Sequence, residues 1–222
     1  MEYQSIQFGI ILKIMDKIKR LSDKANYNLE KAYEILDENT ICHISFIDQE
    51  RPMSIPMAYW RVDNYIYFHA ANKGRFEKST IGKKICVSIA QVKGFVLARS
   101  AFEHTYNYSS VVMHGVPESV DDEDEKIGVL QEFVNGLYPN RWDSLSPIKD
   151  SELRATKVLK MEISNFACKV RSGGPDDSDS EWRDQVWAGH IPLERKLGGS
   201  IEDGESGDNP NSFRKQLKRF ES

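Results

Sequence analysis

The sequence predicts a mainly β fold of the α+β class, in which an antiparallel sheet closes on itself and helices flank it. Between residues 40 and 120 the chain carries short runs rich in β-branched and aromatic residues. Turn-forming segments such as Asp63-Asn64 separate them, and regular spacing with tight connections is typical of closed antiparallel sheets. Amphipathic segments on either side of these runs predict the flanking helices.

The first expected element is a helix over residues 28–39, NLEKAYEILDEN, with Asn28 as its N-cap and apolar residues along one face. Five strands should follow. Pro52 and Pro56 place the second strand at a sheet edge or in an irregular stretch, because proline has no amide to donate to a neighbour. The predicted strands are TICHISFID (40–48), PMSIPMAYWRV (52–62), YIYFHAA (65–71), KICVSIAQV (84–92) and YSSVVMHGVPESV (108–120).

Beyond the strands, residues 122–139 predict a second long helix, because the segment is acidic at its start and apolar along one face. Residues 151–159 offer a further helix start, and 158–171 predict one final strand. We expect one domain over residues 23–193 and a polar, flexible tail over 194–222.

Residues 1–22 are expected to form an N-terminal extension, helical because isoleucines recur at helical spacing between positions 10 and 18. That helix either packs on the domain or lies on a membrane surface. Its apolar run is too short to span a bilayer and is interrupted by Lys13 and Asp16.

The composition excludes several classes of function. A formal charge of −4 argues against nucleic-acid binding through bulk positive charge, although a local basic pocket for one phosphate stays compatible. Cys42, Cys86 and Cys168 are widely spaced, so neither a disulfide framework nor a zinc site is indicated, and a cytoplasmic location is expected. The scattered histidines have no metal-ligand spacing, so no metal site is expected.

Residues 69–79, HAANKGRFEKS, favour a phosphate cradle after a strand end. Gly74 permits close backbone approach, Arg75 can bind a phosphate through two donors, and Lys73 adds charge. The alternative is a basic turn that leads into a short helix. His69 is either a strand-end histidine with a structural role or a proton donor beside a redox cofactor.

The stretch LARSAFEHTYNYSSVVMHG, residues 97–115, is unusually polar for a segment that runs into an apolar strand. Its hydrogen-bonding and aromatic side chains suit a planar, polar-edged ring system with a phosphate tail. The alternative is a polar loop whose aromatic residues close the end of the core. The residues in question are Arg99, Ser100, His104, Asn107, Tyr108 and Ser109, with Phe102, Tyr106 and Trp187 as flat apolar partners.

In these segments the chain resembles the pyridoxamine 5′-phosphate oxidase-like flavoproteins, and specifically the branch related to nitroimidazole-resistance reductases. The resemblance runs from about Lys19 to Leu193 and rests on the order and spacing of its segments. It implies a six-stranded antiparallel split β-barrel and a homodimer that binds FMN in two clefts at the subunit interface. The segments include RPMSIPMAYW, IYFHAANKGR, FVLARSAFEHTYNYSSVVMHG, ELRATKVLKMEI, KVRSGGPDD and VWAGHIPL.

The resemblance also implies roles for individual residues. His69 would transfer a proton or contact substrate, and some residues of the cleft wall would come from the partner chain. The implied flavin contacts are Ser54, Ile55, Pro56 and Met57 along the ring, His69, Ala70, Lys73, Gly74 and Arg75 on the phosphate side, and Arg99, Ser100, His104, Asn107, Tyr108 and Trp187 closing the cleft.

One residue departs from the family pattern. Relatives commonly have an arginine where this chain has Ser109, in the segment NYSSV. A serine offers one hydroxyl, whereas an arginine offers a charged guanidinium with several N–H donors. The departure predicts weaker flavin binding, the use of Arg75 or Arg99 instead, or a different ligand.

Three functions are compatible with the sequence. The first is an FMN-dependent oxidoreductase that reduces a small aromatic or nitro compound, and it involves neither nucleic acid nor membrane. The second is a flavin-binding carrier or sensor without turnover. The third is a dimeric interaction module whose cleft has lost its cofactor.

Overall fold

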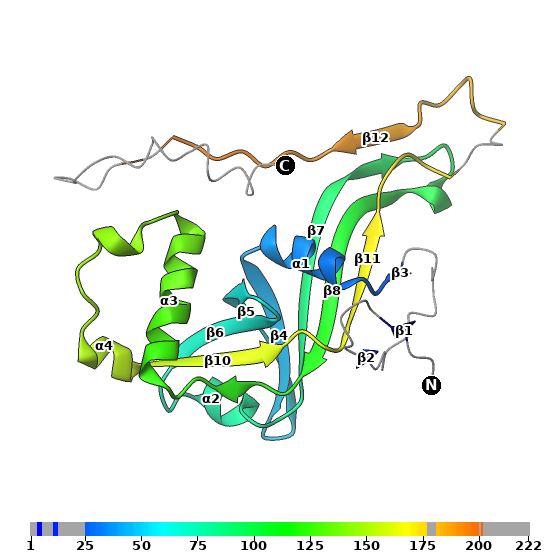
Figure 1. The fold of residues 1–222 in the computed structure, drawn as a ribbon. Helices are drawn as coiled ribbons and strands as arrows, with labels where there is room; N and C mark the ends of the chain where they lie inside the picture. Colours follow the sequence, from blue (N-terminus) through cyan, green and yellow to red (C-terminus); the bar gives the residue numbers. More distant parts are fainter. Residues whose placement is uncertain (1–3, 6–10, 13–24, 177–180, 200, 202–222) are drawn as a thin grey trace.

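The computed structural model describes residues 4–5, 11–12, 25–176, 181–199 and 201. One antiparallel sheet of ten strands curls on itself and carries helices on its outside (Figure 1). Its strands follow the order β3-β11-β8-β7-β4-β5-β6-β10-β9, and β12 pairs with β7. The predicted β-rich, antiparallel fold is confirmed.

The long consecutive strands lie close to the predicted runs. A regular hairpin joins β4 to β5, with Asp48 opposite Arg51 and Ile41 opposite Ala58. Tight turns suffice because neighbouring strands are antiparallel. The strands are β4 (Ile41–Asp48), β5 (Arg51–Val62), β6 (Tyr65–Ala71), β7 (Ile85–Leu97) and β8 (Thr105–Gly115).

The single strand predicted over residues 158–171 is wrong, because the chain forms two strands there. β10 (Thr156–Glu162) pairs with β6, and β11 (Phe166–Arg171) pairs with β8. The reversal between them lies at Ser164-Asn165, where the Asn165 carbonyl accepts a hydrogen bond from the His114 amide at 2.9 Å. The chain therefore crosses here from one half of the sheet to the other.

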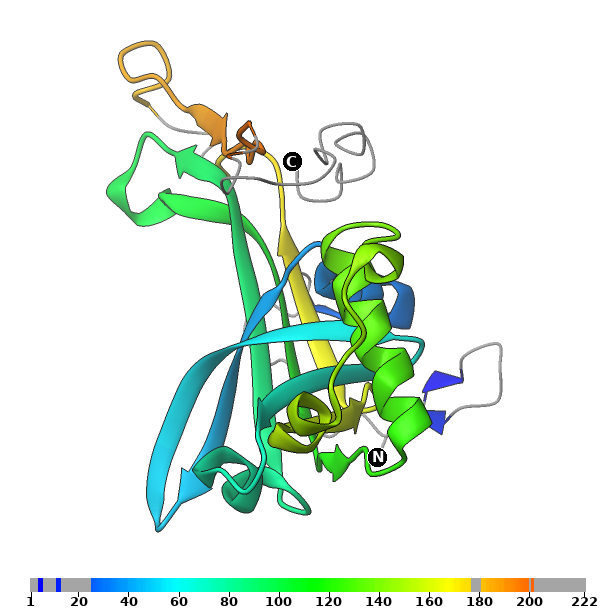
Figure 2. The ribbon, with the colours of Figure 1, turned by 90° about the vertical axis from the view of Figure 1, so that its left-hand side faces the viewer.

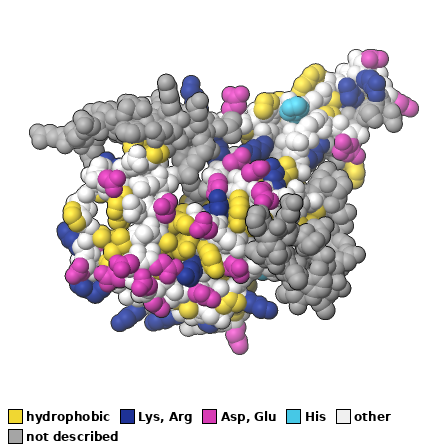
Figure 3. Space-filling model, viewed as in Figure 1, with side chains coloured by type: hydrophobic (Ala, Val, Ile, Leu, Met, Phe, Trp, Pro, Cys, Tyr) yellow, Lys and Arg dark blue, Asp and Glu magenta, His cyan; other side chains and the backbone are white. Residues whose placement is uncertain are grey.

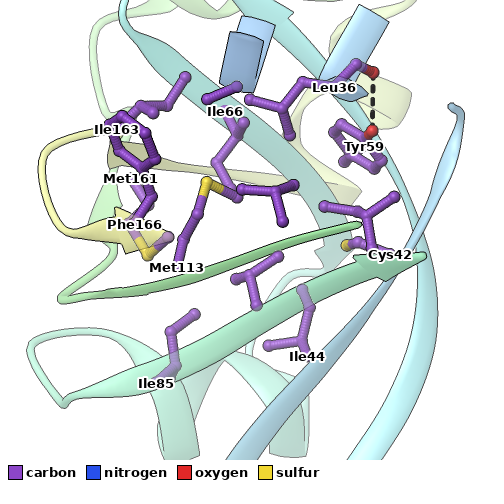
Figure 4. Close-up of a cluster of buried hydrophobic side chains, with 14 of the residues drawn as sticks. Leu36, Cys42, Ile44, Tyr59, Ile66, Ile85, Met113, Met161, Ile163 and Phe166 are labelled. Atoms are coloured by element: carbon purple, nitrogen blue, oxygen red, sulfur yellow. Dashed lines mark hydrogen bonds between the residues drawn. The ribbon is translucent and has the colours of Figure 1, made fainter. Parts of the chain in front are cut away.

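Large apolar side chains fill the inside of the curled sheet (Figure 4). Ile44, Phe68 and Val111 come from three strands, and all three are fully buried. The helix α1 (Leu29–Asp37) contributes further apolar residues and is tied to this core by the Tyr59 hydroxyl, which donates to the Leu36 carbonyl at 2.7 Å (Figure 4).

Capping and an ion pair hold α1 in place. The side-chain oxygen of Asn28 accepts a hydrogen bond from the Lys31 amide at 3.2 Å, which confirms the predicted N-cap. Arg61 donates to both carboxylate oxygens of Asp37, at 2.8 and 2.6 Å, and lies over the ring of Tyr33. The hydrogen bond to Asp37 raises the pKa of Arg61 above its ordinary value.

The second long helix, α3 (Glu123–Leu137), packs on the outer face of the sheet against β5. Asp122 caps it by accepting from the Glu125 amide at 2.8 Å. A smaller apolar cluster lies here and includes Trp60, Tyr67 and Val129. Two short helices complete the body, α2 (Arg75–Thr80) and α4 (Asp150–Ala155).

The far halves of β7 and β8 project from the body as an arm, which both views show (Figure 1 and Figure 2). The arm arises because both strands run beyond their predicted ends, to Leu97 and from Thr105. β12 (Gly189–Pro192) lies along its edge. Gly94 permits this pairing because it has no side chain. A Cβ at this position would lie 2.7 Å from the Ile191 carbonyl oxygen, which is too close for β12 to pair here.

Of the predicted N-terminal extension, Gln4–Ser5 (β1) and Ile11–Leu12 (β2) pair as two short strands and not as a helix. Most of that extension, and most of the predicted flexible tail, lie outside the described residues. Within the described residues, no helix has the length and apolar character needed to cross a membrane.

The cysteine thiols should differ in reactivity. Cys42 and Cys168 are fully buried, and burial raises the pKa of each thiol to about 12. At pH 8 both should stay protonated and unreactive, since the thiolate is the nucleophile. Cys86 is only half-buried. We expect a disulfide-exchange reagent to modify one thiol in the folded chain and all three in denaturant.

Cys86→Ser is the matched control for this experiment and should leave no fast-reacting thiol in the folded protein. Modification of Cys42 or Cys168 as fast as Cys86 under native conditions would contradict the buried positions.

Candidate functional site

One half of β5 has a free edge. Its residues 51–58 pair with β4, whereas pairing with β6 covers only residues 59–62. No other strand in the described chain pairs with this half. The expected edge position is therefore confirmed for residues 51–58, although the strand itself is long and regular in its pairing with β4.

The prolines lie on the free edge and not in the β4 ladder. The Tyr59 amide donates to the Thr40 carbonyl on the β4 side, at 3.1 Å. Backbone amides and carbonyls point to opposite sides of a strand at successive residues. The even-numbered residues from 52 to 58 therefore direct their amides and carbonyls away from β4. Ser54 and Ala58 therefore keep free amides, and Pro52 and Pro56 interrupt that row of donors.

The side chains of this segment divide between the two faces of β5. Ile55 and Met57 pack against the barrel core, while Ser54 and Pro56 are exposed. Ser54 also shares a hydrogen bond with Ser45 on β4 at 3.2 Å. A planar ligand at this edge would thus meet backbone groups and small exposed side chains.

The basic turn after β6 leads directly into α2. Lys73 has a left-handed backbone, φ 60°, and Gly74 is the N-cap residue, where a Cβ would lie 2.9 Å from the Ala71 carbonyl oxygen. Arg75 is exposed and lies 3.7 Å from the carboxylate of Asp48. The local conformation matches the basic turn considered as an alternative, and it leaves the charged groups of Lys73 and Arg75 accessible.

His69 lies on the outer face of β6, opposite Val158 of β10. Its exposed ring contacts two aromatic rings, with centroid distances of 5.6 Å to Phe133 and 6.1 Å to Trp60. The buried Trp60 Nε1 has no hydrogen-bond partner among the residues that the structure describes. Ala70 follows His69 and is half-buried. His69 therefore lies at the rim of an aromatic cluster that contains an unsatisfied donor.

The residues expected to close the cleft lie in and beside the arm. His104 Nδ1 is 2.9 Å from the Ser100 carbonyl, and Arg99 lies just beyond the end of β7. Phe102 is 90% exposed and Trp187 is 64% exposed. In both ribbon views the tip of the arm lies at the opposite end of the molecule from α2 (Figure 1 and Figure 2). One chain therefore does not bring the tip to the basic turn.

Asn107 and Tyr108 lie instead at the base of the arm. The Asn107 side chain is buried and accepts a hydrogen bond from Arg171 at 2.7 Å. The sequence reasoning gave no role to Arg171 or to Trp60. The available signal for Arg171 was an arginine that ends an apolar strand two residues before Gly173-Gly174.

Metal ligands do not gather in the described part of the chain, where no three His, Cys, Asp or Glu side chains could hold an ion. A site here would depend on hydrogen bonding, aromatic contact and the accessible charges of the basic turn.

Comparison with known proteins supports the same fold. The family model of pyridoxamine 5′-phosphate oxidase matches residues 28–170, from the N-cap of α1 to the last residues of β11. The chain belongs to this family. The split barrel of the family accounts for the curled sheet, which here has more strands than the six expected. A search of curated proteins found no match.

Solved structures extend the similarity beyond the part matched by the family model. The flavocytochrome Anf3 from Azotobacter vinelandii is 31% identical, with a TM-score of 0.84 over 89% of this chain and 94% of that one. The FAD and heme binding protein from Mycobacterium smegmatis is 26% identical, with a TM-score of 0.80 over 86% of this chain and 96% of that one.

A protein assigned to 5-nitroimidazole antibiotic resistance, from Bacteroides thetaiotaomicron, shares the fold at lower similarity. It is 18% identical, with a TM-score of 0.54 over 66% of this chain and 86% of that one. This similarity shows a common fold with a nitroimidazole-resistance protein, as the sequence predicted.

Proposed function

We propose that this protein is a flavin-binding oxidoreductase whose flavin lies along the free edge of β5. The observation that carries the proposal is the unpaired half of that strand, residues 51–58. Its free amides and carbonyls can bind the polar edge of a planar ring, as an added strand would. The similarity to a flavocytochrome and to an FAD and heme binding protein over most of the chain supports a flavin as that ring.

The identity of the flavin is part of the proposal. The sequence predicted FMN, whereas the relative from Mycobacterium smegmatis is named for FAD and covers 86% of this chain. We therefore take FAD as the natural flavin and FMN as the alternative. The exposed Lys73 and Arg75 are the basic groups near the edge that would contact its phosphates.

A bound flavin would supply two-electron chemistry, and the chain would supply orientation and a proton. His69 is the group proposed to donate that proton to a small aromatic or nitro compound, because its ring is exposed and an imidazole is a common proton donor in catalysis. The aromatic rings of Trp60 and Phe133 lie against one side of the imidazole and would help to orient it.

A second copy of the chain would complete the cleft. The arm exposes apolar and aromatic side chains far from its own basic turn, and Figure 3 shows apolar surface along it. The homodimer proposed from the sequence would bring a partner's arm to the flavin, which sedimentation of the purified chain as a dimer would check. The exposed side chains of the arm are Val92, Phe95, Phe102, Tyr106, Trp187 and Ile191.

The flavin proposal predicts that the full chain purifies with, or takes up, about one flavin, identified by absorbance and mass spectrometry after release. Ser54→Pro should lower flavin affinity by about fivefold, since one hydrogen bond contributes about 1 kcal/mol. It removes a free-edge amide, while Pro52 and Pro56 show that proline fits on this edge.

Ser54→Ala is the matched control, because it removes the hydroxyl and keeps the amide. A chain that binds neither FMN nor FAD would overturn the proposal. Equal affinities in the two Ser54 variants would contradict the placement at this edge.

A haem is a second candidate ligand, because the protein from Mycobacterium smegmatis is named for FAD and heme binding and Anf3 is named as a flavocytochrome. The described residues fit such a group at one place. His69 offers an exposed imidazole nitrogen, and the ring of Phe133 beside it offers a flat apolar contact. In this case His69 would bind the haem iron and would not act as a proton donor.

A further inference from the structure

A pocket of about 280 Å³ lies between α1 and the base of the arm, where β7, β8, β11 and β12 meet. It is separate from the free edge of β5 and from the tip of the arm. Its wall combines apolar and polar side chains from all of these elements. The residues of this wall include Lys31, Glu34, Ile35, Glu38, Lys93, Asn107, Ser109, Val170, Arg171 and Pro192.

The inner face of β8 changes from apolar to polar as it reaches this pocket. Met113 and Val111 are buried in the barrel core, and the next residues on the same face are Ser109 and Asn107, each 6% exposed. Asn107 is hydrogen-bonded to Arg171, but the buried hydroxyl oxygen of Ser109 has no hydrogen-bond partner among the described residues. An unpartnered buried hydroxyl destabilises a fold unless a ligand or solvent satisfies it.

Arg171 is 8% exposed and carries the uncompensated charge of the pocket. Within the described part of the chain, its guanidinium bonds only to neutral oxygens, those of Asn107 at 2.7 Å, Gly174 at 2.9 Å and Gly173 at 3.5 Å. No carboxylate in the described chain lies within 4.0 Å of it. Buried charges are normally paired, so this one lacks its counter-charge.

Donors remain on the guanidinium for a further partner. An arginine carries five N–H groups, and the three bonds above use two on Nη1 and one on Nη2. The Nε–H and the second Nη2–H form the edge that binds a carboxylate or phosphate through two parallel hydrogen bonds.

The acidic residues of the wall do not cancel this charge. Lys31 is already paired with Glu34, and Lys93 is paired with Glu38 at 2.8 Å. These pairs leave Arg171 as the net positive charge of the pocket.

We propose that this pocket binds a small oxyanion, a carboxylate or a phosphate, between the guanidinium of Arg171 and the hydroxyl of Ser109. Ile35, Val170 and Pro192 would contact the apolar part of a small organic anion. The site goes beyond the proposed flavin edge. Its ligand is either a free small anion or the phosphate of a flavin, which share this chemistry.

The test is a calorimetric titration of the flavin-free full chain with inorganic phosphate and, separately, with benzoate. We expect saturable binding of at least one anion, and about tenfold weaker binding in Ser109→Ala, since a hydrogen bond to a charged group is a strong one. Ser110→Ala is the matched control, because Ser110 is the next residue on the strand and lies outside the pocket wall. Arg171→Lys keeps the positive charge but loses the paired N–H donors of the guanidinium, and should also weaken anion binding about tenfold.

Repeating the titration on flavin-loaded chain distinguishes the two sources. Loss of phosphate binding on loading identifies the flavin's own phosphate as the occupant, and unchanged binding identifies a separate anion. The first titration needs no flavin, so its result is independent of the proposed function. Absence of saturable binding to both anions, or equal affinity in the wild type and Ser109→Ala, would overturn the oxyanion site.

Discussion

His69→Ala is expected to lower the turnover number for reduction of a nitroaromatic acceptor by at least about 100-fold, because a positioned general acid contributes roughly 10²- to 10⁴-fold. The fold should be retained, since the imidazole is exposed and contacts neighbouring rings only at its rim. The measurement is steady-state kinetics from pH 5 to 9 with a reduced nicotinamide as donor.

Tyr65→Ala is the control variant, since Tyr65 lies on the same strand and face and is also exposed. Absorbance separates the two roles of His69. Lost turnover with unchanged spectra supports the role of proton donor, whereas loss of a haem Soret band in His69→Ala supports the role of haem-iron ligand. Unchanged turnover together with unchanged spectra would contradict both roles.

The sequence predicted β4, β5 and β6 to within about a residue because their limits are local. Alternating apolar side chains fix the face of each strand, and turn residues such as Asp63-Asn64 end them. The break between β10 and β11 was missed for the opposite reason. The segment around Ser164 is compatible with an extended chain, and only long-range pairing with β6 and β8 divides it.

The same distinction applies to the candidate site. The free edge of β5 was predictable because proline loses its amide wherever it stands, so Pro52 and Pro56 carry the signal themselves. The roles of Arg171 and Trp60 were not predictable. The partner of Arg171 is Asn107, 64 residues away, and burial of Trp60 depends on where α3 packs. Such contacts are set by tertiary structure and leave no local pattern.

Phe68→Ala is expected to lower the free energy of unfolding by about 3–5 kcal/mol, the range for loss of a buried aromatic side chain. Phe68 is fully buried in the barrel core and lies between Tyr59 of β5 and Leu159 of β10 in the sheet. Neighbours held by two strand ladders cannot collapse into the space, so a cavity remains. Urea denaturation followed by circular dichroism measures the change.

Two comparisons make the Phe68 prediction specific. Tyr65→Ala, on the same strand but 37% exposed, should cost less than about 1.5 kcal/mol because it leaves no internal cavity. Phe68→Leu should cost less than Phe68→Ala, since the cavity it leaves is smaller. A loss below about 1 kcal/mol for Phe68→Ala would contradict the closed core.

Phe68 and His69 also separate stability from function. Adjacent residues of a strand point to opposite faces, so Phe68 anchors β6 from inside the barrel while His69 lies on its outer face. Phe68→Leu should therefore lower stability and preserve turnover. His69→Ala should do the reverse, because its imidazole contributes chemistry and little packing.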